Sequence, residues 1–136
     1  MEKIAVVVEK TEVGYSAYVP EIPGIITVGD TYNDIKRNIQ EALELYWEGE
    51  DENVLPKAVL NAKRNGFEVE LQVDMQELFN HFEGILTKSG LAKITGLNQS
   101  LVSQYALGLK KPSVKQAKKI ESALHNLADQ LWAVRL

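Results

Sequence analysis

The chain of 136 residues contains no cysteine, which excludes disulfides, thiol catalysis and thiolate metal sites. It also lacks any run of about 18 apolar residues, so no transmembrane helix is expected. The first residues are an acidic residue and a short strand-like run, which is unlike a signal peptide. We therefore expect a cytoplasmic protein that does not meet a membrane.

Charge is distributed unevenly along the chain, whose net charge is −4. Residues 1–74 hold 7 Lys or Arg and 15 Asp or Glu, a balance of −8. Residues 75–136 hold 8 Lys or Arg and 4 Asp or Glu, a balance of +4. A basic half attracts phosphates and an acidic half repels them. The alternative is chance solvation of two surfaces, but the break coincides with a change in hydrophobic period.

The first 74 residues alternate as strands do, with a long helical stretch between the last two strands. Pro56 can begin a further short helix there, through Lys63. Short β-branched or alternating runs predict strands at residues 4–8, 15–19, 25–28 and 67–73. Thr31 and Asp34 have the spacing of a capping box that begins a helix. One apolar stripe of about four turns then follows: Ile35, Ile39, Ala42, Leu43 and Tyr46.

From residue 75 the hydrophobic period is helical. One helix is expected from the spacing of Met75, Leu78, Phe79, Phe82, Ile85 and Leu86. A later amphipathic helix is expected from Ala117, Ile120, Leu124, Leu127 and Leu131. We expect two domains, residues 1–74 and residues 75–136, the second with four or five helices.

Between those helices, residues 91–105 predict two helices joined by a tight turn. Gly96 permits a left-handed backbone and Asn98 can cap the second helix. Val102 and Tyr105 give that helix an inward face. Its outward amides and hydroxyls suit base edges in a DNA major groove. The stretch resembles the helix-turn-helix of Cro/Xre-type repressors.

That resemblance implies a set of DNA-binding residues, which are Lys88, Asn98, Gln99, Ser100, Ser103, Gln104, Lys110 and Lys111. Gln99 is expected to bond adenine, and the lysines to meet phosphates. The alternative for each is an ordinary solvated residue. Leu101 departs from the usual polar residue at its position. It either touches a thymine methyl group or packs against a neighbouring side chain.

The acidic half carries a second resemblance. Residues 14–24 (GYSAYVPEIPG), then Gly29-Asp30-Thr31, then a helix containing residues 41–45 (EALEL), resemble the HicB antitoxin family. The resemblance covers about residues 3–74. It implies a partial ribonuclease-H-like domain that binds and inhibits a small mRNA-cleaving toxin, HicA. Members of that family carry a C-terminal DNA-binding domain of ribbon-helix-helix or helix-turn-helix type.

The acidic half also offers carboxylates, and nuclease chemistry needs several of them around divalent metal ions. The candidates are Glu9, Asp30, Glu41, Glu44 and Asp74. Most fall at strand ends or on a solvated helix face, so we expect no catalysis. His81 and His125 lie far apart on separate predicted helices, so we expect no metal and no cofactor.

These patterns predict an α+β chain, with a partial ribonuclease-H-like β-β-β-α-β domain and an all-α helix-turn-helix domain. We expect a type II antitoxin that neutralises a HicA-like ribonuclease and represses its own operon at operator DNA. The alternatives are a ligand-sensing regulator without a toxin partner and an enzyme with residual nuclease activity. Residues 131–136 are unusually apolar. They either fold back on the core or join two copies, and we expect a homodimer or higher homo-oligomer.

Overall fold

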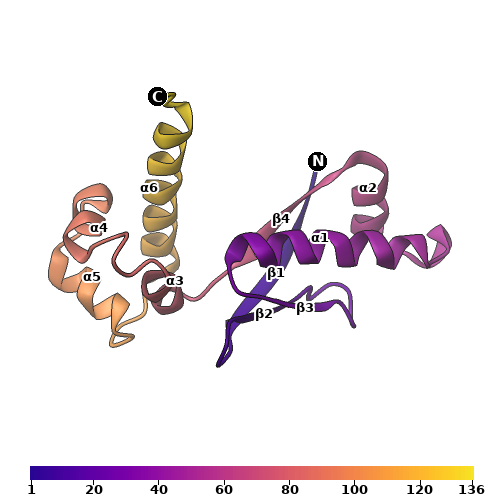
Figure 1. The fold of residues 1–136 in the computed structure, drawn as a ribbon, viewed down its shortest axis with the longest axis horizontal. Helices are drawn as coiled ribbons and strands as arrows, with labels where there is room; N and C mark the ends of the chain where they lie inside the picture. Colours follow the sequence, from indigo (N-terminus) through magenta and orange to yellow (C-terminus); the bar gives the residue numbers. More distant parts are fainter. The chain divides into compact units, whose positions relative to one another are not determined.

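The computed structural model describes residues 1–136, which divide into two compact units. The N-terminal unit, Met1–Val73, holds all four strands, and the C-terminal unit, Asp74–Leu136, is entirely helical (Figure 1). The α+β class expected from the sequence is therefore confirmed. None of the helices is both long and apolar enough to cross a membrane.

The sheet of the N-terminal unit has the strand order β3-β2-β1-β4. Its strands are β1 (Glu2–Lys10), β2 (Tyr15–Tyr18), β3 (Ile26–Gly29) and β4 (Phe67–Gln72). β2 pairs antiparallel with β1 and with β3, whereas β4 pairs parallel with β1. Parallel neighbours need a crossover connection. The chain between β3 and β4 supplies it with two helices.

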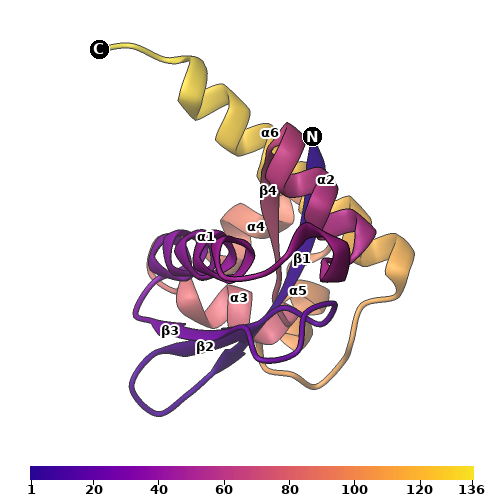
Figure 2. The same cartoon turned by 90° about the vertical axis from the view of Figure 1, so that its right-hand side faces the viewer.

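Helix α1 (Tyr32–Glu48) begins where the sequence predicts and lies over the sheet (Figures 1 and 2). The hydroxyl of Thr31 accepts a hydrogen bond from the backbone N–H of Asp34 at 3.1 Å, which satisfies one of the free donors of the first turn. The apolar stripe is buried against the strands at Ile35, Ile39, Leu43 and Trp47. Trp47, one residue past the end of the predicted stripe, belongs to it as well. Its ring meets Phe67 of β4 edge-on, with centroids 5.3 Å apart.

Helix α2 (Lys57–Asn65) completes the crossover. Pro56 stands just before its first residue, where a missing N–H costs nothing. Gly66 ends it with a φ of +87°, which a side chain would strain. Val59 and Ala62 join the same core as α1 and the sheet. Both helices therefore cover the same face of the sheet.

A carboxylate ties α2 to the short 3-10 helix η1 (Glu52–Val54) that precedes it. Glu52 lies 3.4 Å from the ammonium of Lys63 and 2.9 Å from the guanidinium of Arg64. The hydrogen bond from Arg64, and then its charge, hold the pKa of Glu52 below its ordinary value. The acidic segment after α1 is therefore anchored at one point.

The C-terminal unit contains α3 (Met75–His81), α4 (Lys88–Thr95), α5 (Gln99–Ala106) and α6 (Val114–Ala133). One side chain or more from each helix enters a single core. Its buried members are Phe79, Leu91, Val102, Tyr105 and Ile120. Partly buried residues such as Leu97 and Leu124 pack around it.

The expected helix through Leu86 is wrong in its length, because α3 ends at His81. The N–H groups of Ile85 and Leu86 both donate to the carbonyl of Phe82, which closes a turn in place of a further helical turn. Gly84 within that turn has a φ of +85°. Helical spacing continued past the helix, because Leu86 still packs on the core from a turn.

Helix α6 is longer than the core it packs against. Ile120 is buried and Leu124 is partly buried, but the side chains from Leu131 onward are exposed. The end of α6 stands clear of α3, α4 and α5 in Figure 2. Arg135 donates to the carbonyl oxygens of Trp132 and Val134, which closes the helix end. Of the two alternatives given for residues 131–136, folding back on the core is therefore not observed.

Candidate functional site

The candidate DNA-binding site is built on α4, α5 and the three residues between them. Thr87 caps α4 by accepting the N–H of Gly90 at 3.0 Å. Gly96 then turns the chain with a φ of +73°, and its N–H donates to the carbonyl of Ala92. This left-handed glycine at a helix end is the conformation that the sequence predicts. It lets only three residues connect α4 and α5.

Thr95, which sequence reasoning missed, holds this turn from inside. It is 5% exposed and is the one buried polar residue of the chain. Its hydroxyl donates to the carbonyl of Leu91 at 2.6 Å and accepts the N–H of Leu97 at 3.2 Å. The hydroxyl thus joins the last turn of α4 to the start of the connection. The signal in the sequence that could have identified Thr95 is a threonine directly before a helix-ending glycine.

Helix α5 has the two faces expected of it. Val102 and Tyr105 are buried, while Gln99, Ser100 and Gln104 are exposed. Ser103 is half-buried, so it offers less to a partner than the other three.

Two further residues of α5 or its cap are already engaged within the unit. The side-chain oxygen of Asn98 accepts the N–H of Leu101 at 3.1 Å. Only the amide nitrogen of Asn98 is then left to meet DNA. Leu101 packs against the core of the unit, which is the packing alternative given for it.

The lysines assigned to phosphate contact are exposed, and none has a carboxylate within 4 Å. Lys88 is the first residue of α4, and Lys110 and Lys111 follow α5. The N–H groups of Leu109 and Lys110 donate to the carbonyl of Gln104, which folds this lysine loop back on the end of α5. The structure therefore brings Gln104 and Lys110 together, whereas Lys88 stands on a different helix.

The carboxylates weighed for nuclease chemistry do not converge. Glu9, Asp30, Glu41, Glu44 and Asp74 are all exposed. No group of three or more His, Asp or Glu side chains is placed to hold a metal ion. The ring of His81 meets that of Phe82 edge-on, and His125 is exposed on α6. No catalytic constellation is formed by these residues.

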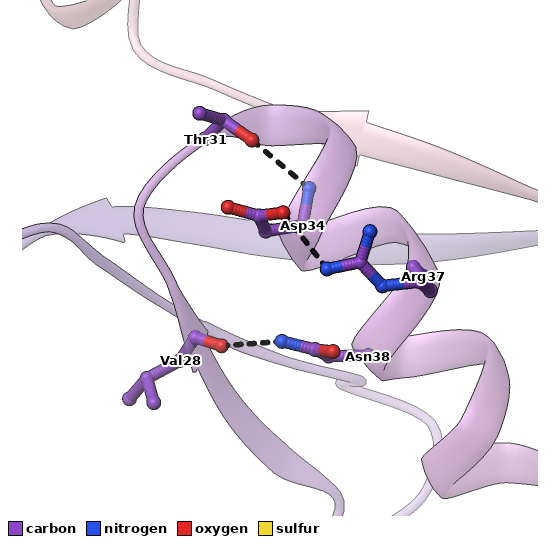
Figure 3. A network of polar contacts seen from close by, with 5 residues as sticks. All are labelled: Val28, Thr31, Asp34, Arg37 and Asn38. Carbon is purple, nitrogen blue, oxygen red and sulfur yellow. Dashed lines mark hydrogen bonds and ion pairs between the residues drawn. The ribbon is translucent and has the colours of Figure 1, made fainter.

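An open depression of about 440 Å³ lies where the β1–β2 turn, the end of β3 and the start of α1 meet. Figure 3 shows the polar contacts on its α1 side. Arg37 lies 2.9 Å from Asp34, and the amide of Asn38 donates to the carbonyl of Val28 at 2.8 Å. Hydrogen bonds from Thr31, then from Arg37, hold the pKa of Asp34 below its ordinary value. These polar groups bond to one another and fix the start of α1 to the edge of the sheet.

Comparisons with known proteins find relatives of part of the chain. One relative is a UPF0150 protein of Helicobacter pylori, 49% identical over 43 residues, or 32% of this chain and 60% of that protein. Another is an uncharacterized 14.9 kDa protein from the rep-hol intergenic region of Haemophilus phage HP1. It is 40% identical over 53 residues, or 38% of this chain and 40% of that protein. The chain thus spans less than two thirds of the length of either relative.

No solved structure matches the chain significantly. Residues 4–78, which are more than half of the chain, match the family described as HicB-like antitoxin of bacterial toxin–antitoxin system. The range contains β2, β3, β4, α1 and α2 in full, and β1 from Ile4 onward. The chain therefore belongs to the family of HicB-like antitoxins of bacterial toxin–antitoxin systems.

Proposed function

We propose that this protein is an antitoxin with two binding surfaces, one for a HicA-like mRNA-cleaving ribonuclease and one for the operator of its own operon. The observation that carries the proposal is the family membership of residues 4–78, followed by a basic helical unit with a polar outward helix face. The chain is not an enzyme in this proposal. Its N-terminal unit is a partial ribonuclease-H-like fold that acts by binding.

The C-terminal unit is proposed to bind DNA as a helix-turn-helix of Cro/Xre type, with α5 in the major groove. Gln99 and Ser100 on the first turn read base edges, and Ser103 and Gln104 follow one turn later. The amide NH2 of Asn98 adds a donor group beside them. The phosphate contacts are assigned to the exposed lysines, Lys88, Lys110 and Lys111. These contacts fix the position of α5 without reading sequence.

A second copy of the chain is the further partner that we propose. Operators of such repressors have two half-sites, which a two-fold dimer matches. Leu131, Trp132 and Val134 form an exposed apolar surface at the end of α6. Burial of this surface between two copies removes apolar area from water, which favours association.

The test uses the purified full chain and the small protein encoded by the neighbouring open reading frame. We expect a tight complex by calorimetry and loss of the partner's RNA cleavage on mixing. We also expect a shift of the operon's own promoter fragment in a gel, but not of a scrambled fragment. Promoter binding without inhibition of RNA cleavage would favour a ligand-sensing regulator. Metal-dependent RNA cleavage by the chain itself would contradict the whole proposal.

A further inference from the structure

One face of the sheet in the N-terminal unit has no helix over it. Ile4, Val6 and Val8 of β1 point toward α1 and α2 and are buried. The residues between them point the other way, since side chains alternate along a strand. The strand pairing places Val7 beside Tyr18, and Tyr18 beside Ile26. We call this line of three the apolar row.

The apolar row is open to solvent, most of all at its outer end. Ile26 is 69% exposed, although its neighbours in the sheet carry apolar side chains. Val28 lies on the same face, two residues along the edge strand, and is also exposed. Scattered exposed apolar residues need no explanation, but a contiguous group on one surface marks an interaction site.

Acidic side chains surround the apolar row on this face. The strand pairing places Glu9 in line with Ser16 and Val28, and Glu70 beside Ala5. Glu68 lies beside Lys3, the one basic residue of this face, whose ammonium is 3.9 Å from Glu70. All three glutamates are exposed. The rim therefore carries more negative than positive charge.

An apolar centre with a charged rim is the usual composition of a protein–protein interface. The negative rim repels nucleic acid and favours a basic protein surface. A ribonuclease must present positive charge where it meets RNA phosphates. As a partner for this face, the RNA-binding side of a ribonuclease therefore fits better than a nucleic acid does.

We propose that the uncovered face of the sheet is the surface that binds the toxin. The apolar row of Val7, Tyr18 and Ile26 lies at its centre, and Glu9, Glu68 and Glu70 meet basic residues of the toxin. This inference rests on the proposed antitoxin function. The antitoxin then occupies the positive surface that RNA requires, so binding and inhibition are one event.

The test compares matched variants of the full chain against the purified toxin from the neighbouring open reading frame. Ile26→Lys places a charge in the apolar row. Leu45→Lys is its control, because it replaces an apolar side chain that is 70% exposed on α1. Glu68→Lys reverses a charge on the rim, and Glu44→Lys reverses one on α1. We expect Ile26→Lys to raise the Kd by about tenfold or more, as loss of an interface anchor does. Glu68→Lys should raise it several-fold, and less so at high salt.

The two α1 variants should bind and inhibit the toxin as the unaltered chain does. Circular dichroism checks that each variant is folded. Glu68→Lys tests the same face at an exposed position if Ile26→Lys does not fold. No toxin binding by the unaltered chain would contradict the antitoxin function itself. Normal toxin binding that is weakened by Leu45→Lys or Glu44→Lys, and not by the sheet variants, would place the interface on α1 and overturn this inference alone.

Discussion

At the scale of single residues, the structure separates side chains that hold α5 in place from those left for a partner. The side-chain oxygens of Thr95 and Asn98 accept hydrogen bonds from backbone N–H groups of the turn and of α5. The side chains of Gln99, Ser100 and Gln104 are exposed. Base recognition and phosphate contact are therefore testable by substitutions that leave the core intact.

Gln99→Ala should weaken binding to the specific operator by roughly 1–3 kcal/mol, because a bidentate contact to a base is lost. Base preference should relax at one position of each half-site. Lys110→Ala should instead weaken binding to all sequences alike and make the salt slope shallower by about one unit. Gel shifts on operator and scrambled DNA at several salt concentrations measure both effects.

The pair of variants is informative because each controls for the other. An unchanged specificity ratio for Gln99→Ala would move base reading to Ser103 and Gln104. Of those two, Gln104 is the more exposed. If neither variant alters binding, α4 and α5 serve structure or assembly, and the repressor half of the proposal is wrong.

At the scale of elements, the helix ends were predictable from sequence because their signals are local. Thr31, Asn98 and Gly96 each act on residues within four positions along the chain. The end of α3 was not predictable in the same way. Leu86 keeps helical spacing while it packs on the core from a turn, so the hydrophobic spacing did not reveal where the helix stops.

Gly96→Ala should destabilise the C-terminal unit by about 1–2 kcal/mol, because its φ of +73° disfavours a Cβ atom. No atom lies within 4 Å of the added carbon, so the cost comes from the backbone alone. Gly96→Asn should recover part of the loss, since Asn tolerates this conformation better. Amide hydrogen exchange at Val102 and Tyr105 reports the stability of this unit. Equal exchange rates in all three proteins would contradict the strained-turn argument.

The start of α1 should show a pH-dependent contribution to stability. Thr31→Ala removes the cap and should lower the free energy of unfolding by about 1 kcal/mol at neutral pH. It also removes the main cause of the lowered pKa of Asp34, so that pKa should rise toward its ordinary value of 3.8. Carboxyl NMR titration measures the pKa, and fluorescence of buried Trp47 follows unfolding of this unit.

The direction of the pH effect follows from linkage. The folded state holds the pKa of Asp34 below its unfolded value, so folding is favoured when this carboxylate is charged. The contribution is therefore present above pH 3.8 and is lost as the pH falls through the lowered folded-state pKa. In that acid range, the free energy of unfolding of Asp34→Asn should approach that of the unaltered chain. If the free energies of unfolding of Asp34→Asn and the unaltered chain differ by the same amount across the range, this role of Asp34 is contradicted. Thr31→Ser is the control variant, because its hydroxyl should keep the cap.

At the scale of the whole molecule, local patterns indicated the strands and the uneven charge, but not the surfaces that stay exposed. Alternation in β1 predicts which residues share a face, yet it does not say which face the helices take. Helical spacing in α6 likewise continues to Leu131, beyond the point where the core ends. Both uncovered surfaces depend on long-range packing, which local patterns do not specify.

The exposed end of α6 leads to the prediction for assembly. Trp132 is 79% exposed and Val114, at the first position of the same helix, is 80% exposed. If two copies associate through the end of α6, Trp132→Glu should shift the chain from dimer to monomer in sedimentation equilibrium. Val114→Glu, with equal exposure and the same change in charge, should leave the dimer intact.

The consequence for DNA follows from the same association. A dimer engages two half-sites, and the second contact is made at the high effective concentration that linkage provides. Trp132→Glu should therefore lower affinity for the full operator far more than affinity for a single half-site. Val114→Glu should change neither the affinity for the full operator nor that for a single half-site. If the unaltered chain is monomeric, or if both variants dimerise equally, the end of α6 does not join the copies. Another surface must then bring two recognition helices to the operator.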